Sequence, residues 1–289
     1  MTEAERKQII DLVQREVVPA IGCTEPIAVA LCVAKATETL GTRPEKINVL
    51  LSANILKNAM GVGIPGTGMI GLPIAIALGA LVGKSEYQLE VLKDSNPAAV
   101  DEGKRFIAEK RINISLKENI SEKLYIEVCC ESGENKATAI IAGGHTTFIY
   151  IARNGGILFS RQNASSEETK EQTVDLTLRK VYDFAMDAPL DEIRFILETA
   201  RLNKAAAESS FDKNYGHGLG RMLRGTYEHK ILGDSVFSHI LSYTSGACDA
   251  RMAGAMIPVM SNSGSGNQGI AATLPVLSFA EDIQCSEEQ

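Results

Sequence analysis

A cysteine at the start of a predicted helix is the residue of this chain with the clearest chemistry. Cys23 stands in the segment Ile-Gly-Cys-Thr-Glu-Pro, directly before Thr24, which is a good helix-capping residue. Glu25 and Pro26 suit the first helical turn. A helix N-terminus lowers the pKa of a thiol, and the resulting thiolate is the form that binds metals and attacks electrophiles. The pattern favours a metal-binding or nucleophilic Cys23 over the alternative, a small buried residue before a cap.

Two glycine-rich segments, 66–72 and 264–270, share one pattern: Gly, Ser or Thr, Gly, two variable residues, Gly, then Leu or Ile. Glycines let backbone N–H groups approach an anion closely, and a following helix supports its charge. We expect two equivalent loops that face each other across one site; the alternative is close helix packing without a ligand. The pattern also matches a dinucleotide fingerprint, but no acidic residue follows the second segment at the spacing that a ribose contact requires. A nicotinamide cofactor is therefore not favoured.

Four histidines and one lysine complete the set of candidate reactive groups. His145 lies in Ala-Gly-Gly-His-Thr-Thr, where glycines break a strand and expose a side chain at a bend. His217, in Tyr-Gly-His-Gly-Leu-Gly, is a second candidate base, whereas His229 and His239 have the pattern of ordinary surface or helix-face residues. Lys57 precedes the first glycine segment, so a pyridoxal phosphate Schiff base beside a phosphate-binding loop is an alternative chemistry.

The composition is that of a folded globular chain. Its 289 residues are 45% hydrophobic and 22% charged, which excludes a disordered chain and allows a sizeable core. The net charge of −7 and the lack of a basic patch argue against nucleic acid as a partner. The polar start Met-Thr-Glu-Ala-Glu-Arg lacks the apolar run of a signal peptide, so we expect the six cysteines to be unpaired in a reducing, cytoplasmic compartment.

The order of predicted elements indicates an α+β fold. The uncharged stretch 58–83 is rich in glycine, which predicts a loop and a short buried helix over 72–82 rather than a membrane span. A period of two predicts strands over 112–117, 124–131, 136–141 and 147–152, in an antiparallel unit. The polar stretch 162–172 then leads to helices, including a long one over 189–210. We expect a mainly helical body, residues 1–87 and 164–289, interrupted by an antiparallel-sheet α+β subdomain, residues 88–163.

Taken together, five motifs resemble the serine dehydratase alpha-chain-like family, and within it the L-cysteine desulfidase branch. They are IGCTEPIAVAL, GIPGTGMIGLP, AGGHT, YGHGLGR and IPVMSNSGSGNQGIAATLP, and they span nearly the whole chain. The resemblance implies an oxygen-sensitive 4Fe-4S cluster that is held by three cysteines, with one iron open to substrate, and it implies no pyridoxal phosphate. The implied reaction is β-elimination of L-cysteine to sulfide, ammonia and pyruvate, with L-serine dehydration as the sister reaction.

The resemblance also suggests roles for individual residues. Cys23 would be one cluster ligand, and His145 is our choice for the catalytic base, a role that the family match does not determine. Hydroxyls, amide oxygens and backbone N–H groups of the two glycine segments and of the first helix would bind the carboxylate and ammonium groups of the substrate. The residues expected to bind substrate are Thr24, Thr67, Gly68, Ser263, Ser265 and Asn267.

One departure from the family pattern concerns the cluster. The other cluster cysteines of the family lie in helical motifs well beyond the second glycine segment, and neither Cys248 nor Cys285 has that context. We therefore expect a helical domain that is incomplete at its C-terminal side, a chain that is catalytically silent by itself, and an alternative role as a cluster-free amino-acid-binding or regulatory module. The apolar residues Leu274, Val276, Leu277 and Phe279 would then be exposed or covered by another copy, which favours a homo-oligomer.

Overall fold

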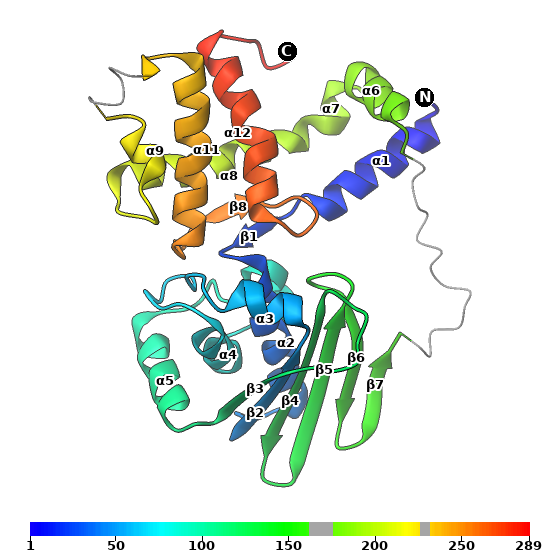
Figure 1. Ribbon diagram of the computed structural model, residues 1–289. Helices are drawn as coiled ribbons and strands as arrows, with labels where there is room; N and C mark the ends of the chain where they lie inside the picture. The colour runs from blue at the N-terminus through cyan, green and yellow to red at the C-terminus, as the bar shows by residue number, and fades with distance from the viewer. Residues whose placement is uncertain (162–175, 226–231) are drawn as a thin grey trace. The chain divides into compact units, whose positions relative to one another are not determined.

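Figure 1 shows the computed structural model of the chain, which describes residues 1–161, 176–225 and 232–289. The predicted connector 162–172 and His229 lie outside these residues. The chain divides into two compact units. The helical unit contains Met1–Pro19, Ser165–Asp249 and Val259–Gln289, and the sheet unit contains Ala20–Ala164 and Ala250–Pro258. The predicted subdomain 88–163 falls within the sheet unit, which also takes in residues 20–87.

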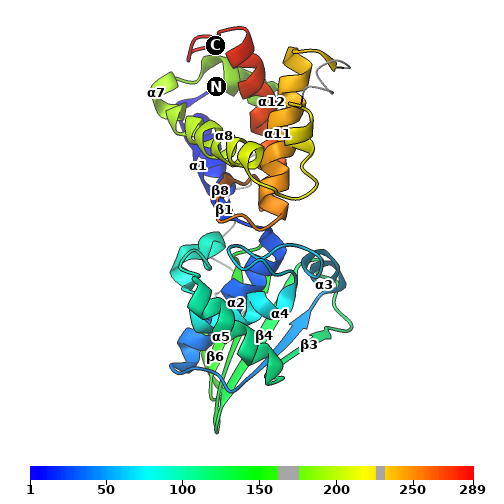
Figure 2. The ribbon, with the colours of Figure 1, turned by 90° about the vertical axis from the view of Figure 1, so that its left-hand side faces the viewer.

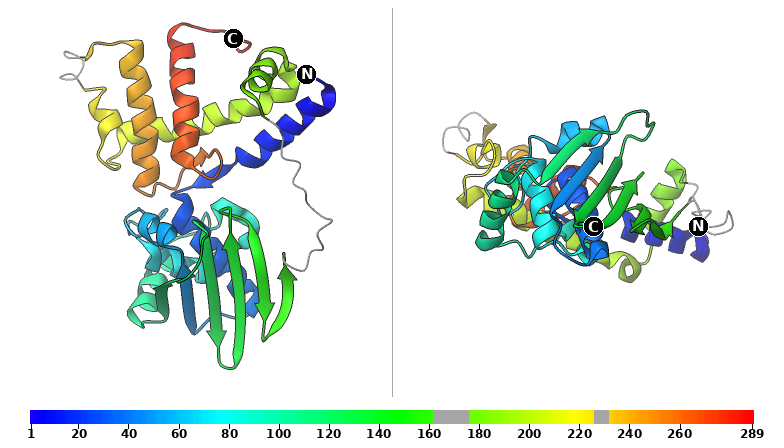
Figure 3. Two further views of the ribbon diagram at one scale, coloured as in Figure 1. Left: turned by 45° about the vertical axis from the view of Figure 1, so that its right-hand side comes forward. Right: turned by 90° about the horizontal axis from the view of Figure 1, so that it is seen from below.

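The described part of the sheet unit is built on six strands in the order β3-β2-β4-β5-β6-β7 (Figure 3). The strands are β2 Lys46–Leu51, β3 Ile112–Leu116, β4 Tyr125–Ser132, β5 Asn135–Ala142, β6 Phe148–Arg153 and β7 Gly156–Ser160. The expected α+β class and the antiparallel pairing of β4, β5 and β6 are confirmed. The sheet is nevertheless mixed, because β2 lies between β3 and β4 and pairs in parallel with β3.

A buried helix, α2 (Thr24–Leu40), packs against β4 and β5 and forms the centre of the sheet unit. Most of its side chains are buried, as its run of Ala, Val and Leu residues requires. Helix α4 (Leu72–Leu81) approaches α2 so closely that a Cβ atom on Gly79 would lie 2.6 Å from the carbonyl oxygen of Ala30. Shorter elements complete the unit: α3 Ala53–Ala59, the 3₁₀ helix η1 Ser85–Glu90 and α5 Pro97–Ala108. Among the described residues, no helix is both long and apolar enough to cross a membrane.

In the helical unit, α8 (Leu197–Asp212) packs against α12 (Gly266–Asp282), as Figure 2 shows. The other helices are α1 Glu3–Glu16, α6 Leu178–Asp187, α7 Leu190–Ile193, the 3₁₀ helix η2 Arg194–Ile196, α9 Leu219–Met222 and α11 Val236–Met252, whose last three residues belong to the sheet unit. The capping box of Thr2 and Glu5 at α1 is present. The predicted long helix over 189–210 is present as α7, η2 and α8 in direct succession, with a 3₁₀ turn in place of an α-helical one at 194–196.

The short strands β1 (Pro19–Ile21) and β8 (Pro258–Met260) are where the chain passes from one unit to the other. Within the helical unit, the buried Asn203 of α8 accepts a hydrogen bond from the Met260 backbone N–H at 2.8 Å. Ser261 donates both its backbone N–H and its hydroxyl to the Val18 carbonyl. These bonds tie the segment before the second glycine pattern to α8 and to the residues that follow α1.

Candidate functional site

A group of polar side chains surrounds the N-terminus of α2 in the sheet unit. Cys23 is itself the N-cap residue, with extended backbone angles and a buried side chain, and Thr24 is the first helical residue. The expectation that Thr24 caps the helix is therefore wrong. The Cys23 side chain forms no capping bond to the helix backbone, which leaves its thiol free to bond elsewhere.

Glu25 is the centre of this group, and sequence reasoning did not select it. Its Oε2 atom accepts hydrogen bonds from the Cys23 thiol at 3.0 Å and from the Thr24 hydroxyl at 3.2 Å. Its Oε1 atom accepts one from the Asn58 amide of α3 at 3.3 Å. Burial opposes ionisation of Glu25, but the Cys23 bond, its own backbone N–H, the His145 charge and Thr24 together hold its pKa below the usual value. Glu25 is therefore a carboxylate at neutral pH.

The ionisation of Cys23 differs from the sequence-based expectation. Burial and the negative charge of Glu25 raise the pKa of the Cys23 thiol to about 11, against the opposing effect of the Arg251 charge. The expected low thiol pKa is therefore wrong, because desolvation and a neighbouring carboxylate outweigh the helix dipole. Cys23 is a thiol that donates to Glu25 in the absence of a metal or electrophile.

His145 and Arg251 bring an imidazole and a guanidinium into the same unit. His145 lies in the turn between β5 and β6, and Arg251 is buried in the last turn of α11. Burial is the main cause that lowers the pKa of His145; the Glu25 charge raises it and the Arg251 charge lowers it. His145 is thus a neutral imidazole at pH 7, which is the form that accepts a proton.

The first glycine segment is a turn of the sheet unit, and the Gly66 N–H also donates to the Gly254 carbonyl at 3.1 Å. The Thr67 hydroxyl donates to the Ile64 carbonyl at 2.8 Å and accepts the Met69 backbone N–H at 2.9 Å. Gly63 and Ile70 form an antiparallel bridge across the turn. Gly68 has a φ of 64°, and a Cβ atom there would have nothing within 4 Å. Gly68 therefore has open space where a side chain would stand, whereas the Thr67 hydroxyl bonds within the loop.

The second glycine segment belongs to the helical unit and leads directly into α12. Ser265 is the N-cap of α12 and accepts the Gln268 backbone N–H at 3.3 Å. Ser263 has a φ of 47° and bonds to Asn262 through its hydroxyl and to the Glu16 carbonyl through its N–H. Asn267 lies in the first turn of α12. Because the two segments belong to different units, a site that they share stays a prediction.

A cavity of about 530 Å³ in the helical unit lies beside α12, η2, α8 and the last residues of the chain. Asn262, Gly269 and Thr273 line it, with apolar neighbours that include Val276 and Leu277. Of the four apolar residues expected to be exposed, Val276 and Phe279 are exposed, but Leu274 is wholly buried. The α12 face beside this cavity is thus apolar and partly open.

The remaining candidates have structural surroundings. The Asp249 side chain accepts hydrogen bonds from the backbone N–H groups of His217 at 3.1 Å and Gly220 at 3.3 Å. These two N–H groups of the glycine-rich loop are therefore bonded within the protein. Lys57 is exposed on α3, which is unlike the desolvated amine of a Schiff-base lysine. Neither residue joins the group around Glu25 by a described hydrogen bond.

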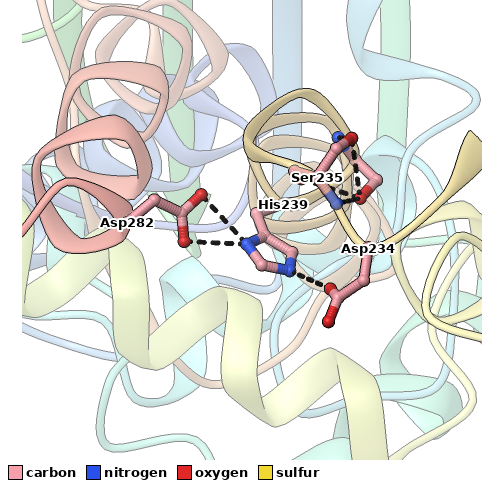
Figure 4. Close-up of polar contacts among 5 residues, drawn as sticks. Asp234, Ser235, His239 and Asp282 are labelled. Carbon is pink, nitrogen blue, oxygen red and sulfur yellow. Dashed lines mark hydrogen bonds and ion pairs between the residues drawn. The ribbon is translucent and has the colours of Figure 1, made fainter.

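His239 lies on a face of α11, as expected, and its side chain is partly buried. It stands between two carboxylates, with Nδ1 2.8 Å from Asp282 at the end of α12 and Nε2 2.6 Å from Asp234 (Figure 4). The bond to Asp282 is the largest cause that raises the pKa of His239, and Asp234 adds to it. The imidazole therefore links the C-terminal end of α12 to α11.

The ligands for the implied cluster can be tested against the described residues. All six cysteines lie in the described ranges and are free thiols. No group of three His, Cys, Asp or Glu side chains in the described part of the chain is placed to hold a metal ion. The described residues therefore do not fit a complete three-cysteine cluster site.

Comparisons with known proteins place the chain in a family. The family model for the serine dehydratase alpha chain matches residues 86–289. A UPF0597 protein of Bacteroides fragilis is 78% identical over 289 residues, which are the whole of this chain and 68% of that protein. UPF0597 proteins of Bacteroides thetaiotaomicron and Porphyromonas gingivalis are 74% and 51% identical, over the whole of this chain and 67% and 68% of their own lengths. No solved structure matches. The chain therefore belongs to the serine dehydratase alpha-chain family.

Proposed function

We propose that this protein is a lyase for β-elimination on a small amino acid, with L-cysteine as the favoured substrate and sulfide, ammonia and pyruvate as products. L-Serine is the second candidate substrate. The observation that carries the proposal is the grouping of a carboxylate, a thiol and a neutral imidazole at the N-terminus of α2, in a member of a serine dehydratase family. We place the protein in the reducing cytosol, with a small amino acid rather than a nucleic acid or a membrane as its partner.

The roles of the residues follow from what β-elimination requires. A base removes the proton from Cα while the β-substituent departs. A neutral His145 suits the base, because burial lowers its pKa and so favours the form that accepts a proton. Thr24, Gly68 and the second glycine segment remain proposed substrate contacts. Thr67 acts in this scheme by holding the loop that presents Gly68.

The family resemblance suggests a 4Fe-4S cluster, which would supply a Lewis acid for the leaving group. We propose Cys23 as one of its ligands in the longer relatives. Since the described residues of this chain do not make a complete ligand set, no chemical step is assigned to the cluster here. The same observation favours a second candidate function: an amino-acid-binding module that has no turnover by itself.

Anaerobic reconstitution with iron and sulfide, followed by sulfide and pyruvate assays, separates the two functions. We expect the longer Bacteroides fragilis relative to bind iron and release sulfide from L-cysteine, and the 289-residue chain to do neither. Cys23→Ser in the relative should remove most of the iron and nearly all turnover while the fold persists. Full iron content and activity in that variant would reduce Cys23 to a packing residue. Steady turnover by the 289-residue chain would show that other cysteines here act as ligands.

A further inference from the structure

We infer that two adjoining cavities of the helical unit form a docking groove for an amphipathic helix, and that the longer relatives supply this helix from the part of their chains that lies outside the match. We name this surface the α12 groove; its walls are α12, η2, the start of α8 and α7. A helix with apolar side chains along one side is a common occupant of an apolar groove. Docking of this kind concerns the helical unit alone and does not depend on the proposed reaction.

The two cavities of the α12 groove have volumes of about 530 and 340 Å³. They share the lining residues Ile196, Leu197, Glu287 and Gln289. Large apolar side chains in the linings are 38–68% exposed, namely Leu190, Ile196, Leu197 and Val276. Apolar side chains that gather in one exposed, concave surface mark an interaction site. The α12 groove therefore fits a partner that brings apolar side chains of its own.

Two hydroxyl groups in the larger cavity donate within their own part of the chain. The Thr199 hydroxyl donates to the Ile196 carbonyl at 2.6 Å, and the Thr273 hydroxyl donates to the Gly269 carbonyl at 2.8 Å. A hydroxyl has one proton to donate, so neither group offers a free donor to a polar ligand. Apolar side chains therefore suit this lining better than the carboxylate of an amino acid does.

Charged residues along the α12 groove are paired with one another. Glu281 of α12 lies 2.6 Å from the Lys204 ammonium group, and Glu287 lies 2.8 Å from the Arg194 guanidinium group. All four side chains are partly exposed. An apolar centre with a polar, hydrated rim is the usual organisation of a protein–protein interface. Because the pairs neutralise each other, the partner needs no opposite charge at this rim.

The concave shape of the α12 groove disfavours a second copy of the chain as its cover. A two-fold interface places the same surface of both copies in contact. Two concave surfaces that meet leave voids, whereas the centre of a stable interface is packed as closely as a protein interior. A convex part of another copy would give a head-to-tail contact, which generates rings or open filaments. A helix of the same polypeptide fills the groove without either consequence.

The relatives contain additional chain that can supply such a helix. The match covers 68% of the Bacteroides fragilis relative, and 67% and 68% of those from Bacteroides thetaiotaomicron and Porphyromonas gingivalis. About a third of each relative therefore lies outside the match, whereas an average helix needs only about 10–14 residues. Burial of the exposed side chains of the groove under one such helix would stabilise the relatives.

Hydroxyl-radical footprinting of the 289-residue chain and of the Bacteroides fragilis relative, read by mass spectrometry, tests this docking. Rates are normalised to those of the unfolded proteins, which corrects for differences in residue type. Val276 is 68% exposed, so we expect rapid labelling of it in the 289-residue chain. The aligned residue of the relative should be labelled several-fold more slowly, because the docked helix covers it. Ile157 of β7, which is 53% exposed in the sheet unit, is the control and should be labelled alike in both proteins.

Thermal unfolding of aspartate variants gives a second measurement. Val276→Asp should leave the Tm of the 289-residue chain unchanged, because this side chain already contacts water. The same change at the aligned position of the relative should lower its Tm by several degrees, since a charge would then be buried under the helix. Ile157→Asp is the matched control variant and should shift the Tm of both proteins by the same amount.

Equal normalised labelling of position 276 in the two proteins, or slow labelling of it in the 289-residue chain, would overturn the inference. Equal Tm shifts from the aspartate substitution at position 276 would do the same. A dimer of the 289-residue chain in light scattering that Val276→Asp separates would assign the groove to a second copy, and so would also contradict the docked helix. None of these measurements depends on turnover, so a failure of the proposed lyase function would be a separate result.

Discussion

The two glycine segments have the same residue pattern but different structures. In the first, Gly66, Gly68 and Gly71 all have positive φ, and α4 begins only after the third glycine. In the second, positive φ occurs at Gly264, and α12 begins earlier, at the second glycine of the pattern. The glycines of the first segment thus serve a turn, whereas Gly269 of the second allows a helix to pack closely against the Met260 carbonyl.

The hydroxyl residues at matching positions differ in the same way. The Thr67 hydroxyl closes its turn by bonding to Ile64 and Met69. The Ser265 hydroxyl instead caps α12 by accepting from Gln268. A shared sequence pattern is therefore weak support for a shared ligand, because backbone conformation decides which N–H groups and hydroxyls remain available.

Substitution of the third glycine of the second segment should be the most damaging. A Cβ atom at position 269 would lie 2.0 Å from the carbonyl oxygen of Met260, so Gly269→Ala requires a backbone shift. We expect the free energy of unfolding to fall by about 2–4 kcal/mol. Denaturant titration followed by tyrosine fluorescence or circular dichroism measures this loss. Gly68→Ala is the matched variant in the first segment. It meets open space and should cost about 1 kcal/mol, from its left-handed backbone alone. Equal losses would contradict the difference in packing.

Removal of the two hydroxyls should cost similar amounts but loosen different elements. Ser265→Ala should lower stability by about 1 kcal/mol and increase hydrogen exchange in the first turn of α12. Thr67→Val should also cost about 1 kcal/mol, with faster exchange at the Met69 amide. Hydrogen exchange read by mass spectrometry separates these responses, with Thr67→Ser as the control that keeps the hydroxyl. If Thr67→Val left exchange at Met69 unchanged, the turn would not depend on that bond.

The smallest effect concerns pH and the far end of α12. The folded pKa of His239 is raised, so its stabilising contribution is complete below the ordinary value of 6.5 and is lost as pH rises through the folded pKa. We therefore expect backbone amides in the last turn of α12 to exchange faster once the pH is above the folded pKa of His239, after correction for the intrinsic effect of pH on exchange. The amides of α4 should show no such change. His239→Gln should remove the pH dependence. A pH response of the same size in α4 would point to a general effect of charge instead.

The strands of the sheet show how much local pattern can reveal. The predicted ranges 124–131, 136–141 and 147–152 lie within about a residue of β4, β5 and β6, because alternating side chains and short polar turns are local signals. The parallel pairing of β2 with β3 was not predicted, since it joins residues 47 and 112 across several other elements. Strand β7 was also missed. Its apolar residues Ile157, Leu158 and Phe159 are all exposed, so no alternating burial pattern marks it.

The sequence by itself determined the α+β class, the positions of Cys23 and His145 at helix and strand ends, and the membership of the serine dehydratase alpha-chain family, which the comparisons confirm. Tertiary structure alone decided the ionisation of Cys23 and the importance of Glu25. Burial and charge depend on side chains that come from separate elements, here α2, α3, the turn after β5 and the end of α11. No spacing along the chain records those neighbours, because desolvation and Coulomb interaction act through space.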